Sequence, residues 1–299
     1  MPEIAETRDK FLQLVAELRP ELHRYCARMT GSVFDGEDVV QDALAKAYYA
    51  LGQFVEPPNL KPWLFRIAHN TAMDFLRRYE RKNVEPVPEL PERAEPEETG
   101  VDPALVEAAL SVFAELTPVQ RAALILKDVL GQSLDEIAIT METSVGAVKA
   151  ALFRARSNVA RARSAPSHSL VPTEHDTHLD RYVDLFNERD WDALRNLLAE
   201  EARLDQVSLV QRRVADAGYF ARYAEILQTE DIRAKAGFVD GVPAIAMFRS
   251  DSNVTPAYFV LIEWRDDRVA KIRDFRYVPY IADGARFSAR LQLRRIDPA

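Results

Sequence analysis

The stretch Ser133–Arg163, with the sequence SLDEIAITMETSVGAVKAALFRARSNVARAR, decides how this chain is interpreted. Ser133 and Glu136 form a capping box that starts one short helix, and Thr143-Ser144 caps a second. The second helix carries cations and no acid: Lys149, Arg154, Arg156, Arg161 and Arg163. In a helix-turn-helix, the second helix enters the major groove of DNA while the first braces it. The stretch therefore predicts a DNA-binding module rather than a solvated basic helix.

The composition limits how such a module works. The chain has 299 residues and a formal net charge of −8. An acidic protein has low non-specific affinity for nucleic acid, so the basic charge must be local and DNA binding must be conditional or assisted by a partner. The single cysteine, Cys26, excludes an internal disulfide framework and a thiolate zinc cluster.

Targeting signals are not evident in the sequence. The N-terminal residues include acids, and no apolar run approaches the length of about 20 residues that a membrane-spanning helix needs. We expect a soluble, cytoplasmic protein without a membrane partner.

Two polar stretches divide the chain. Residues 85–102 are rich in proline and glutamate, which is typical of an extended, self-repelling linker. A second linker is expected at residues 166–177, after the basic helix. Three blocks remain, at residues 1–84, 103–165 and 178–299.

The first block is helical by pattern. Asp35-Gly36-Glu37-Asp38 gives a start signal, and the apolar residues between Val39 and Leu51 then follow helical spacing. A second amphipathic helix covers Trp63–Arg81, and its polar face mixes amide, cationic and aromatic side chains. Such a mixture suits unstacked bases, although a tryptophan at the start of a helix is more often a core residue.

The motifs of the first two blocks together resemble one known family. The run from Asp35 to Asp42, followed by Pro62–Arg78, closely resembles region 2 of the sigma-70 family of RNA polymerase sigma factors. The run Ser144–Arg156 is similar to their region 4. Because the acidic linker alone separates the two, the arrangement resembles the extracytoplasmic-function group.

The resemblance implies roles for individual residues. It implies that core RNA polymerase, through its β′ clamp and β subunits, and promoter DNA are the partners. The residues expected to bind polymerase are Asp35, Glu37, Asp38 and Gln41. Those expected to capture and melt the −10 element are Trp63, Arg66, Asn70, Thr71, Asp74, Arg77 and Arg78. Those expected to hold the −35 element are Ser144, Lys149, Arg154 and Arg156, while Ala150 and Ala151 stand where many relatives carry polar residues.

The third block has a different pattern. Two helices, at Leu179–Phe186 and Trp191–Leu198, precede five strand-like runs: Arg203–Val210, Ile232–Val239, Val242–Arg249, Ala257–Trp264 and Val269–Val278. A further helix is expected near Ala215–Leu227. The block resembles the SnoaL-like group of cone folds. The fold class expected for the whole chain is two all-α modules followed by an α+β cone with a curved antiparallel sheet.

Relatives of this cone fold include enzymes that hold an acid/base pair inside the cone. The candidate pocket residues are Asp205, Tyr258, Trp264, Arg273, Asp274 and Arg276. Carboxylates on strands are usually exposed or paired with arginine, so we expect no enzyme activity, no cofactor and no metal site. The apolar positions change parity between Ile272 and Phe275, which indicates either a bulge or a sheet buried on both faces.

The sequence therefore predicts a sigma factor that directs promoter-specific initiation and is regulated by its cone domain, whose ligand, if it has one, is unknown. Three alternatives stay open at this point. An ordinary helix-turn-helix regulator would explain Ser133–Arg163 without the first block. A DNA-binding protein with an enzymatic or ligand-binding cone, and a cone that serves as a dimerisation module, would each explain the third block.

Overall fold

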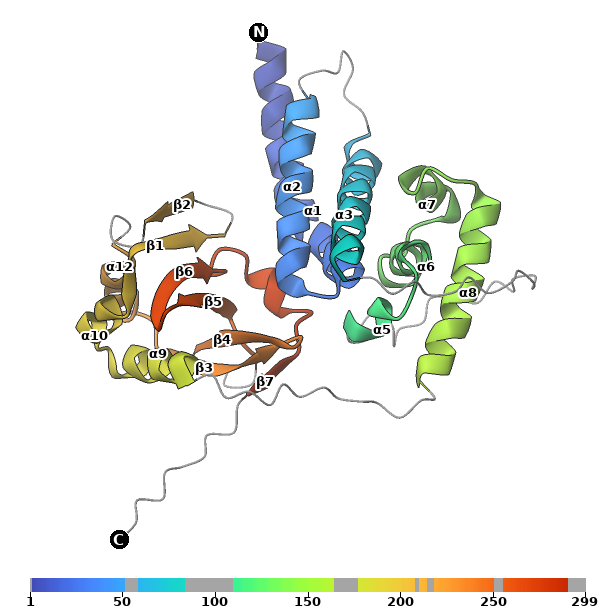
Figure 1. Ribbon diagram of the computed structural model, residues 1–299. Coiled ribbons are helices and arrows are strands. Elements are labelled where there is room, and N and C mark those ends of the chain that lie inside the picture. The colour runs from blue at the N-terminus through green and yellow to red at the C-terminus, as the bar shows by residue number, and fades with distance from the viewer. Residues whose placement is uncertain are drawn as a thin grey trace. The chain divides into compact units, whose positions relative to one another are not determined.

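The chain divides into two units, residues 1–168 and 169–299, which are described separately below. A computed structural model describes residues 2–51, 59–83, 110–163, 177–207, 210–213, 218–249 and 255–289 (Figure 1). The acidic linker at 85–102 and most of the second linker lie outside the described residues.

Three long helices form the first part of unit one. They are α1 (Pro2–Thr30), α2 (Val33–Leu51) and α3 (Leu60–Asn83). Gly31, with a φ of +82°, makes the tight turn from α1 into α2. Gly36 brings these helices close together, since a Cβ there would lie 2.5 Å from the backbone of Ala27. The predicted start of α2 at Asp35 is two residues late, because the hydroxyl of Ser32 accepts a hydrogen bond from the Asp35 amide at 3.2 Å and the helix begins at Val33.

The second part of unit one contains the predicted helix-turn-helix. Its elements are α5 (Leu110–Ala114), α6 (Pro118–Leu124), the π-helical turn η1 (Ile125–Val129), α7 (Leu134–Thr140) and α8 (Val145–Arg163). The predicted caps are present. Thr117 caps α6, Ser133 and Glu136 form the capping box of α7, and the Ser144 hydroxyl accepts from the Ala147 amide at 3.2 Å. The π-helical turn was not predicted.

These two helical parts share a hydrophobic core. Buried residues from both, including Tyr25 and Phe65 on one side and Phe113 and Leu126 on the other, form one continuous cluster. Arg121 strengthens the junction, because its guanidinium donates to the backbone oxygens of Met29 in α1 and of Ala114 and Leu116. Blocks that are separate in sequence are therefore packed together in this unit.

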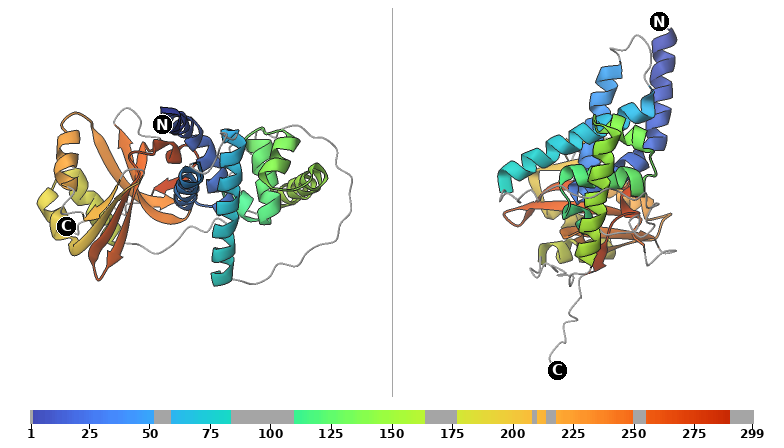
Figure 2. Two further views of the ribbon diagram at one scale, coloured as in Figure 1. Left: turned by 90° about the horizontal axis from the view of Figure 1, so that it is seen from above. Right: turned by 90° about the vertical axis from the view of Figure 1, so that its right-hand side faces the viewer.

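Unit two is a curved sheet with helices on one face. The helices are α9 (Thr177–Glu188), α10 (Trp191–Asn196) and α12 (Tyr219–Ile226), with a short 3₁₀ turn η2 (Pro279–Ala282). The strands are β1 (Leu198–Gln206), β2 (Val210–Arg213), β3 (Ile232–Val239), β4 (Val242–Arg249), β5 (Tyr258–Arg265), β6 (Arg268–Asp274) and β7 (Phe287–Ala289). The helices lie against one face of the sheet (Figure 2). Apolar side chains of the three helices and of this sheet face form the core. The predicted α+β cone is confirmed.

The strand order corrects one detail of the prediction. The order is β2-β1-β6-β5-β4-β3-β7, and β3 to β6 form the expected antiparallel meander. However, β1 pairs with β6 in parallel. A parallel pair needs a crossover connection, and the chain supplies one by placing α12 and four strands between β1 and β6. The sheet is therefore mixed rather than wholly antiparallel.

The tight turns and the parity change both have physical causes. Asp240-Gly241 and Asp266-Asp267 all adopt positive φ, as the two-residue hairpins β3–β4 and β5–β6 require. Ile272 is buried within β6, whereas Phe275 is buried just after the strand ends at Asp274. The pairing of β5 with β6 also shifts register between Glu263 and Trp264.

Candidate nucleic-acid and polymerase interface

The polar residues of α2 divide into an outer group and an inner one. Asp35, Asp38 and Gln41 are half-buried, so part of each side chain reaches solvent. Glu37 is fully buried and forms an ion pair with Arg19 of α1, and it also accepts a hydrogen bond from Gln41 at 3.4 Å. The carboxylate of Glu37 therefore joins α1 to α2 and cannot touch a partner directly.

The α3 helix has a buried face and an exposed face. Trp63 and Thr71 belong to the interior, with Trp63 in the core and the Thr71 hydroxyl accepting from the Lys46 ammonium at 3.1 Å. His69 is buried as well. Its Nδ1 lies 2.7 Å from the Tyr25 hydroxyl, and burial lowers the pKa of the imidazole to about 4.

The exposed face of α3 carries the remaining predicted residues. Asn70, Asp74, Arg77 and Arg78 are exposed, and Arg66 is partly exposed. Asp74 orders the two arginines, because Arg77 donates to its carboxylate and Arg78 to its backbone oxygen, both at 3.3 Å. This face presents an amide, a carboxylate and two guanidinium groups within two helical turns.

The predicted residues of α8 have different environments. Ser144 and Arg154 are exposed, and Lys149 is half-buried. Ala151 is buried in the core, which explains why a small apolar residue stands there. Arg156 points inward and forms two hydrogen bonds with Asp128, at 3.0 and 2.7 Å. The structure therefore brings Arg156 to η1 rather than to the outer face of α8.

A groove of about 630 Å³ lies between α3 and the helix-turn-helix. One wall consists of Asn70, Asp74 and Arg77, and the other includes Thr143 and Ala147 at the start of α8. Arg66 and Glu142 form an ion pair across the same two elements, at 3.8 Å. The exposed face of α3 and the first turn of α8 therefore face each other within unit one.

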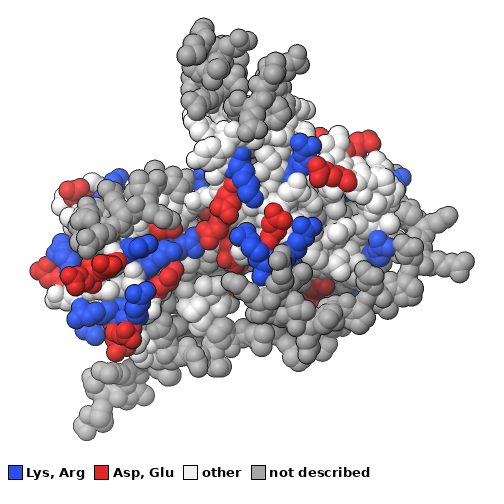
Figure 3. Space-filling view, turned by 45° about the horizontal axis from the view of Figure 1, so that its top comes forward, with Lys and Arg blue, Asp and Glu red and all other residues white. Residues whose placement is uncertain are grey.

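Charge on the visible surface is mixed. The Lys and Arg side chains drawn in Figure 3 are interspersed with Asp and Glu, without one large field of either sign. This agrees with the overall charge of −8 and with positive charge that acts locally.

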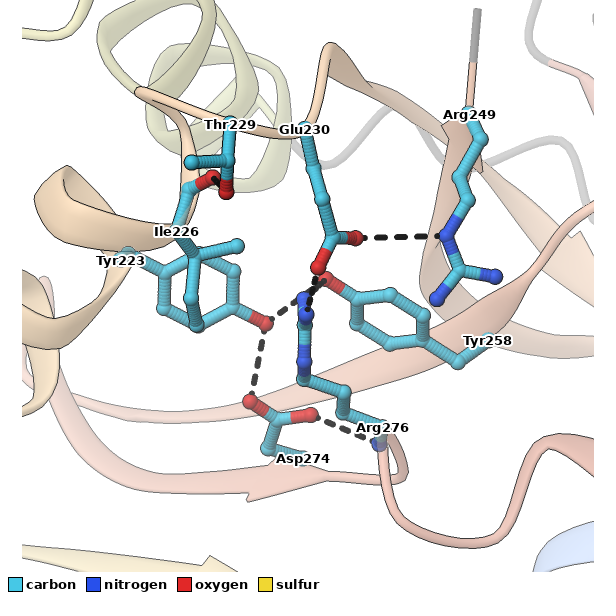
Figure 4. Close-up of polar contacts among 8 residues, drawn as sticks. All are labelled: Tyr223, Ile226, Thr229, Glu230, Arg249, Tyr258, Asp274 and Arg276. Carbon is cyan, nitrogen blue, oxygen red and sulfur yellow. Dashed lines mark hydrogen bonds and ion pairs between the residues drawn. The ribbon is translucent and has the colours of Figure 1, made fainter. Parts of the chain in front are cut away.

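Unit two holds a buried polar cluster around Asp274, at the end of β6 (Figure 4). Asp274 is 1% exposed, and its carboxylate accepts hydrogen bonds from the hydroxyls of Tyr219 and Tyr223, at 3.0 and 2.9 Å, and from the Arg276 amide at 2.9 Å. Burial raises the pKa of Asp274, and these three donors oppose that effect.

The cluster continues to the surface. The hydroxyls of Tyr223 and Tyr258 lie 3.0 Å apart, and the Arg276 guanidinium donates to Tyr258 at 3.2 Å. Arg276 also forms an ion pair with Glu230 at 2.7 Å, and Glu230 accepts from the exposed Arg249 at 3.3 Å. Burial and the nearby Asp274 raise the pKa of Tyr258 to about 12.

The six predicted cone residues fall into separate groups. Tyr258, Asp274 and Arg276 meet in the cluster, whereas Arg273 pairs with Asp205 at 3.5 Å and Trp264 lies beside His178, with ring centroids 5.2 Å apart. Arg273 and Asp274 separate because neighbouring residues of a strand point to opposite faces. Tyr219, Tyr223 and Glu230 also belong to the cluster and were not predicted from the sequence. Their signal was the spacing of the two tyrosines by one helical turn in α12.

The described residues include neither a metal cluster nor a membrane-spanning helix. No group of three or more His, Cys, Asp or Glu side chains in that part of the chain could hold a metal ion. Among the same residues, no helix is long and apolar enough to cross a membrane.

Comparisons with known proteins agree with these modules. The family descriptions "Sigma-70 region 2" and "Sigma-70, region 4" match residues 14–82 and 100–159. The ECF RNA polymerase sigma-E factor of Escherichia coli is 35% identical over 137 residues, covering 42% of this chain and 72% of that protein. Among solved structures, the extracytoplasmic function sigma factor SigJ of Mycobacterium tuberculosis is 22% identical, with a TM-score of 0.35, and the match covers 88% of this chain and 95% of SigJ.

A further relative extends the similarity beyond the two sigma regions. The ECF RNA polymerase sigma factor SigG of Mycobacterium tuberculosis is 30% identical over 303 residues, covering 90% of this chain and 82% of SigG. The chain thus belongs to the extracytoplasmic-function sigma factors, which bind core RNA polymerase and direct transcription from promoter DNA.

Proposed function

We propose that α3 captures the −10 element as a single strand and that α8 binds the −35 element as a duplex. The exposed groups of α3 suit unstacked bases, because guanidinium planes stack on bases and amides bond to base edges. A helix with exposed cations suits the major groove and its phosphates. The residues assigned to DNA are Asn70, Asp74, Arg77 and Arg78 on α3 and Ser144, Lys149 and Arg154 on α8.

The buried predicted residues take supporting roles in this proposal. Trp63 and Thr71 fix the inner side of α3, and Arg66 lies at the border of its exposed face. On α2, Asp35, Asp38 and Gln41 contact the β′ clamp of polymerase, while Glu37 holds α2 against α1. The β subunit is the second polymerase contact. Replacing Asp38 and Gln41 by alanine is expected to abolish binding to core polymerase, whereas Asp42→Ala, an exposed change on the same helix, leaves binding intact.

The observation that carries the proposal is the groove between α3 and the start of α8. The −10 and −35 elements are roughly 25 base pairs apart, as their numbering implies, which is about 85 Å along B-DNA. Two faces that line one groove cannot reach both elements at once. Initiation therefore requires α3 and the helix-turn-helix to separate, and the closed arrangement is the inactive one.

A reversible crosslink tests this requirement. Arg66→Cys and Glu142→Cys, joined by a cleavable bis-methanethiosulfonate reagent, fix the closed arrangement of the full chain. The native Cys26 does not interfere, since it is fully buried and burial raises the pKa of its thiol. We expect the crosslinked protein to lose initiation in vitro with core polymerase and to recover it after reduction.

A matched pair of cysteines provides the control. Lys61→Cys and Glu21→Cys replace another ion pair, at 3.0 Å, whose members both lie among the first three helices. Crosslinking this pair leaves the groove free to open, so initiation continues. Equal initiation by both crosslinked proteins would contradict the proposal.

The cone domain is proposed to regulate this opening without catalysing a reaction. The described surroundings of Asp274 support this role, because its carboxylate already accepts hydrogen bonds from two tyrosine hydroxyls and a backbone amide. In vitro transcription with core polymerase, comparing the full chain with a chain ending at residue 168, tests this role. The location proposed for the protein is the cytoplasm, where the polymerase acts. A change in initiation, in either direction, supports regulation. Identical activity would leave the cone without a role in initiation.

A further inference from the structure

The π-helical turn η1 sets an acid inside the core of the helix-turn-helix unit. A π-helical turn holds one more residue than an α-helical turn, and such turns occur frequently at functional sites. Here the Leu130 amide bonds to the Ile125 oxygen, five residues earlier, at 3.0 Å. Asp128 lies in this turn and is fully buried. A buried carboxylate needs a charged or hydrogen-bonding partner, because leaving water is costly for an ion.

Arg156 of α8 is that partner. Its Nε donates to one carboxylate oxygen of Asp128 at 3.0 Å, and its Nη2 donates to the other at 2.7 Å. The side chain of Arg156 is 24% exposed. This two-bond geometry fixes the orientation of the guanidinium relative to the carboxylate as well as their distance, since both planar groups must lie side by side.

A second contact joins the same elements. The amide of Asn158 on α8 donates to the Gln120 side chain on α6 at 3.1 Å. Asn158 follows Arg156 by two residues on α8, whereas Gln120 and Asp128 lie at opposite ends of the α6–η1 helix. Two points of attachment along one helix restrict both the tilt and the rotation of α8.

We propose that the Asp128–Arg156 pair positions α8 for the −35 element, and that Arg156 is a positioning residue rather than a DNA contact. The proposal rests on the assignment of −35 binding to α8. Arg154, two residues earlier, is exposed and makes the phosphate contact. The two arginines therefore have different tasks although they stand in the same basic run.

Substitution by lysine separates the two tasks. A lysine keeps the charge that a phosphate contact needs but lacks the planar fork that pairs with a carboxylate. With the full chain bound to core polymerase on a promoter fragment that supports initiation, we expect Arg154→Lys to weaken binding less than Arg156→Lys does, because a phosphate contact needs a positive charge rather than a fork. Arg156→Lys is expected to weaken binding by about tenfold, and Asp128→Asn by a similar factor, through loss of the same fork.

The salt dependence of binding gives the second measurement. Removing one phosphate contact lowers the slope of log K against log salt by about 0.9. Arg154→Ala is therefore expected to reduce the slope, whereas Arg156→Lys and Asp128→Asn leave it unchanged. In the double variant Asp128→Asn/Arg156→Lys, the loss is expected to equal that of either single change, because both remove one interaction. Unfolding curves confirm that each variant is folded at the assay temperature.

The outcomes distinguish the two proposals. If Arg156→Lys binds normally and Asp128→Asn has no effect, Arg156 acts as a point charge and the positioning role is wrong. If Asp128→Asn prevents folding, the promoter affinity of the Arg156→Lys variant alone still decides whether Arg156 has a positioning role. If Arg154→Ala and Lys149→Ala leave both affinity and slope unchanged, α8 does not bind the −35 element. In that case the proposed function fails first.

Discussion

Two buried aspartates, one in each unit, show two ways to keep a carboxylate in a protein interior. Asp128 is bonded to the guanidinium of Arg156, which brings a full opposite charge. Asp274 is bonded to two tyrosine hydroxyls and an amide, which bring dipoles, while Arg276 reaches the cluster through Tyr258. The first arrangement depends on one residue, whereas the second is shared among several donors. The comparison teaches that equal burial does not mean equal sensitivity to mutation or to pH.

The largest effect is expected where the single partner is removed. Arg156→Met leaves Asp128 as a fully buried charge without its guanidinium, and breaking such a pair costs about 3–5 kcal/mol. Urea unfolding of the full chain, followed by a probe in unit one, measures the loss. Arg154→Met is the control and should change stability by less than about 0.5 kcal/mol, because Arg154 is exposed. Equal losses would show that Asp128 does not depend on its fork.

A smaller effect is expected where donors are shared. Tyr223→Phe removes one hydroxyl from Asp274 and from Tyr258, which costs about 1–3 kcal/mol. Tyr219→Phe removes a donor from Asp274 but keeps the contact between Tyr223 and Tyr258, and should cost less. The unfolding of unit two, followed by tyrosine fluorescence, measures both. A larger loss for Tyr219→Phe than for Tyr223→Phe would contradict this order.

The smallest effect is a dependence on pH. Because the pKa of Asp274 is raised in the folded protein, the folded state binds its proton more tightly than the unfolded state does. Stability from this group is therefore gained as the pH falls from neutral towards the ordinary carboxyl pKa of about 4, with a slope of at most about 1.4 kcal/mol per pH unit.

The groups that face Asp274 during this titration are Tyr182 on α9, Tyr219 and Tyr223 on α12, Tyr258 on β5, and Arg276. Asp274→Asn should flatten the dependence of the stability of unit two on pH, measured by urea unfolding between pH 5 and 7. If the stability of this variant changes with pH as steeply as that of the original protein, another group is responsible for the pH dependence.

Local signals in the sequence were sufficient for much of the fold. Capping residues such as Ser133 and Thr117 satisfy backbone amides within one turn, so their meaning is contained in a few neighbouring residues. The same is true of Asp240-Gly241, whose hairpin joins two strands with the predicted bounds. Family resemblance supplied the rest of the helical architecture.

The candidate sites were less predictable, because they depend on contacts between distant residues. Nothing near Arg156 indicates that its partner is Asp128, since the π-helical turn that contains Asp128 has no sequence signature of its own. Likewise Tyr223 of α12 and Asp274 of β6 are far apart in the sequence and meet only through the topology of unit two. Exposure of α3 was predicted by its periodicity, yet the burial of Thr71 depends on Lys46 from another helix.

The parallel pairing of β1 with β6 has a consequence for how the chain is made. During synthesis β1 emerges early, but its inner neighbour β6 follows only after α12 and four further strands. Such non-local pairing is slow and leaves a strand edge exposed until it completes. The helical unit meanwhile has all its helices. A ribosome that stops between residues 163 and 177 therefore releases a finished sigma unit, whereas one that stops within β3 to β5 releases a chain with an open sheet edge and a strong tendency to aggregate.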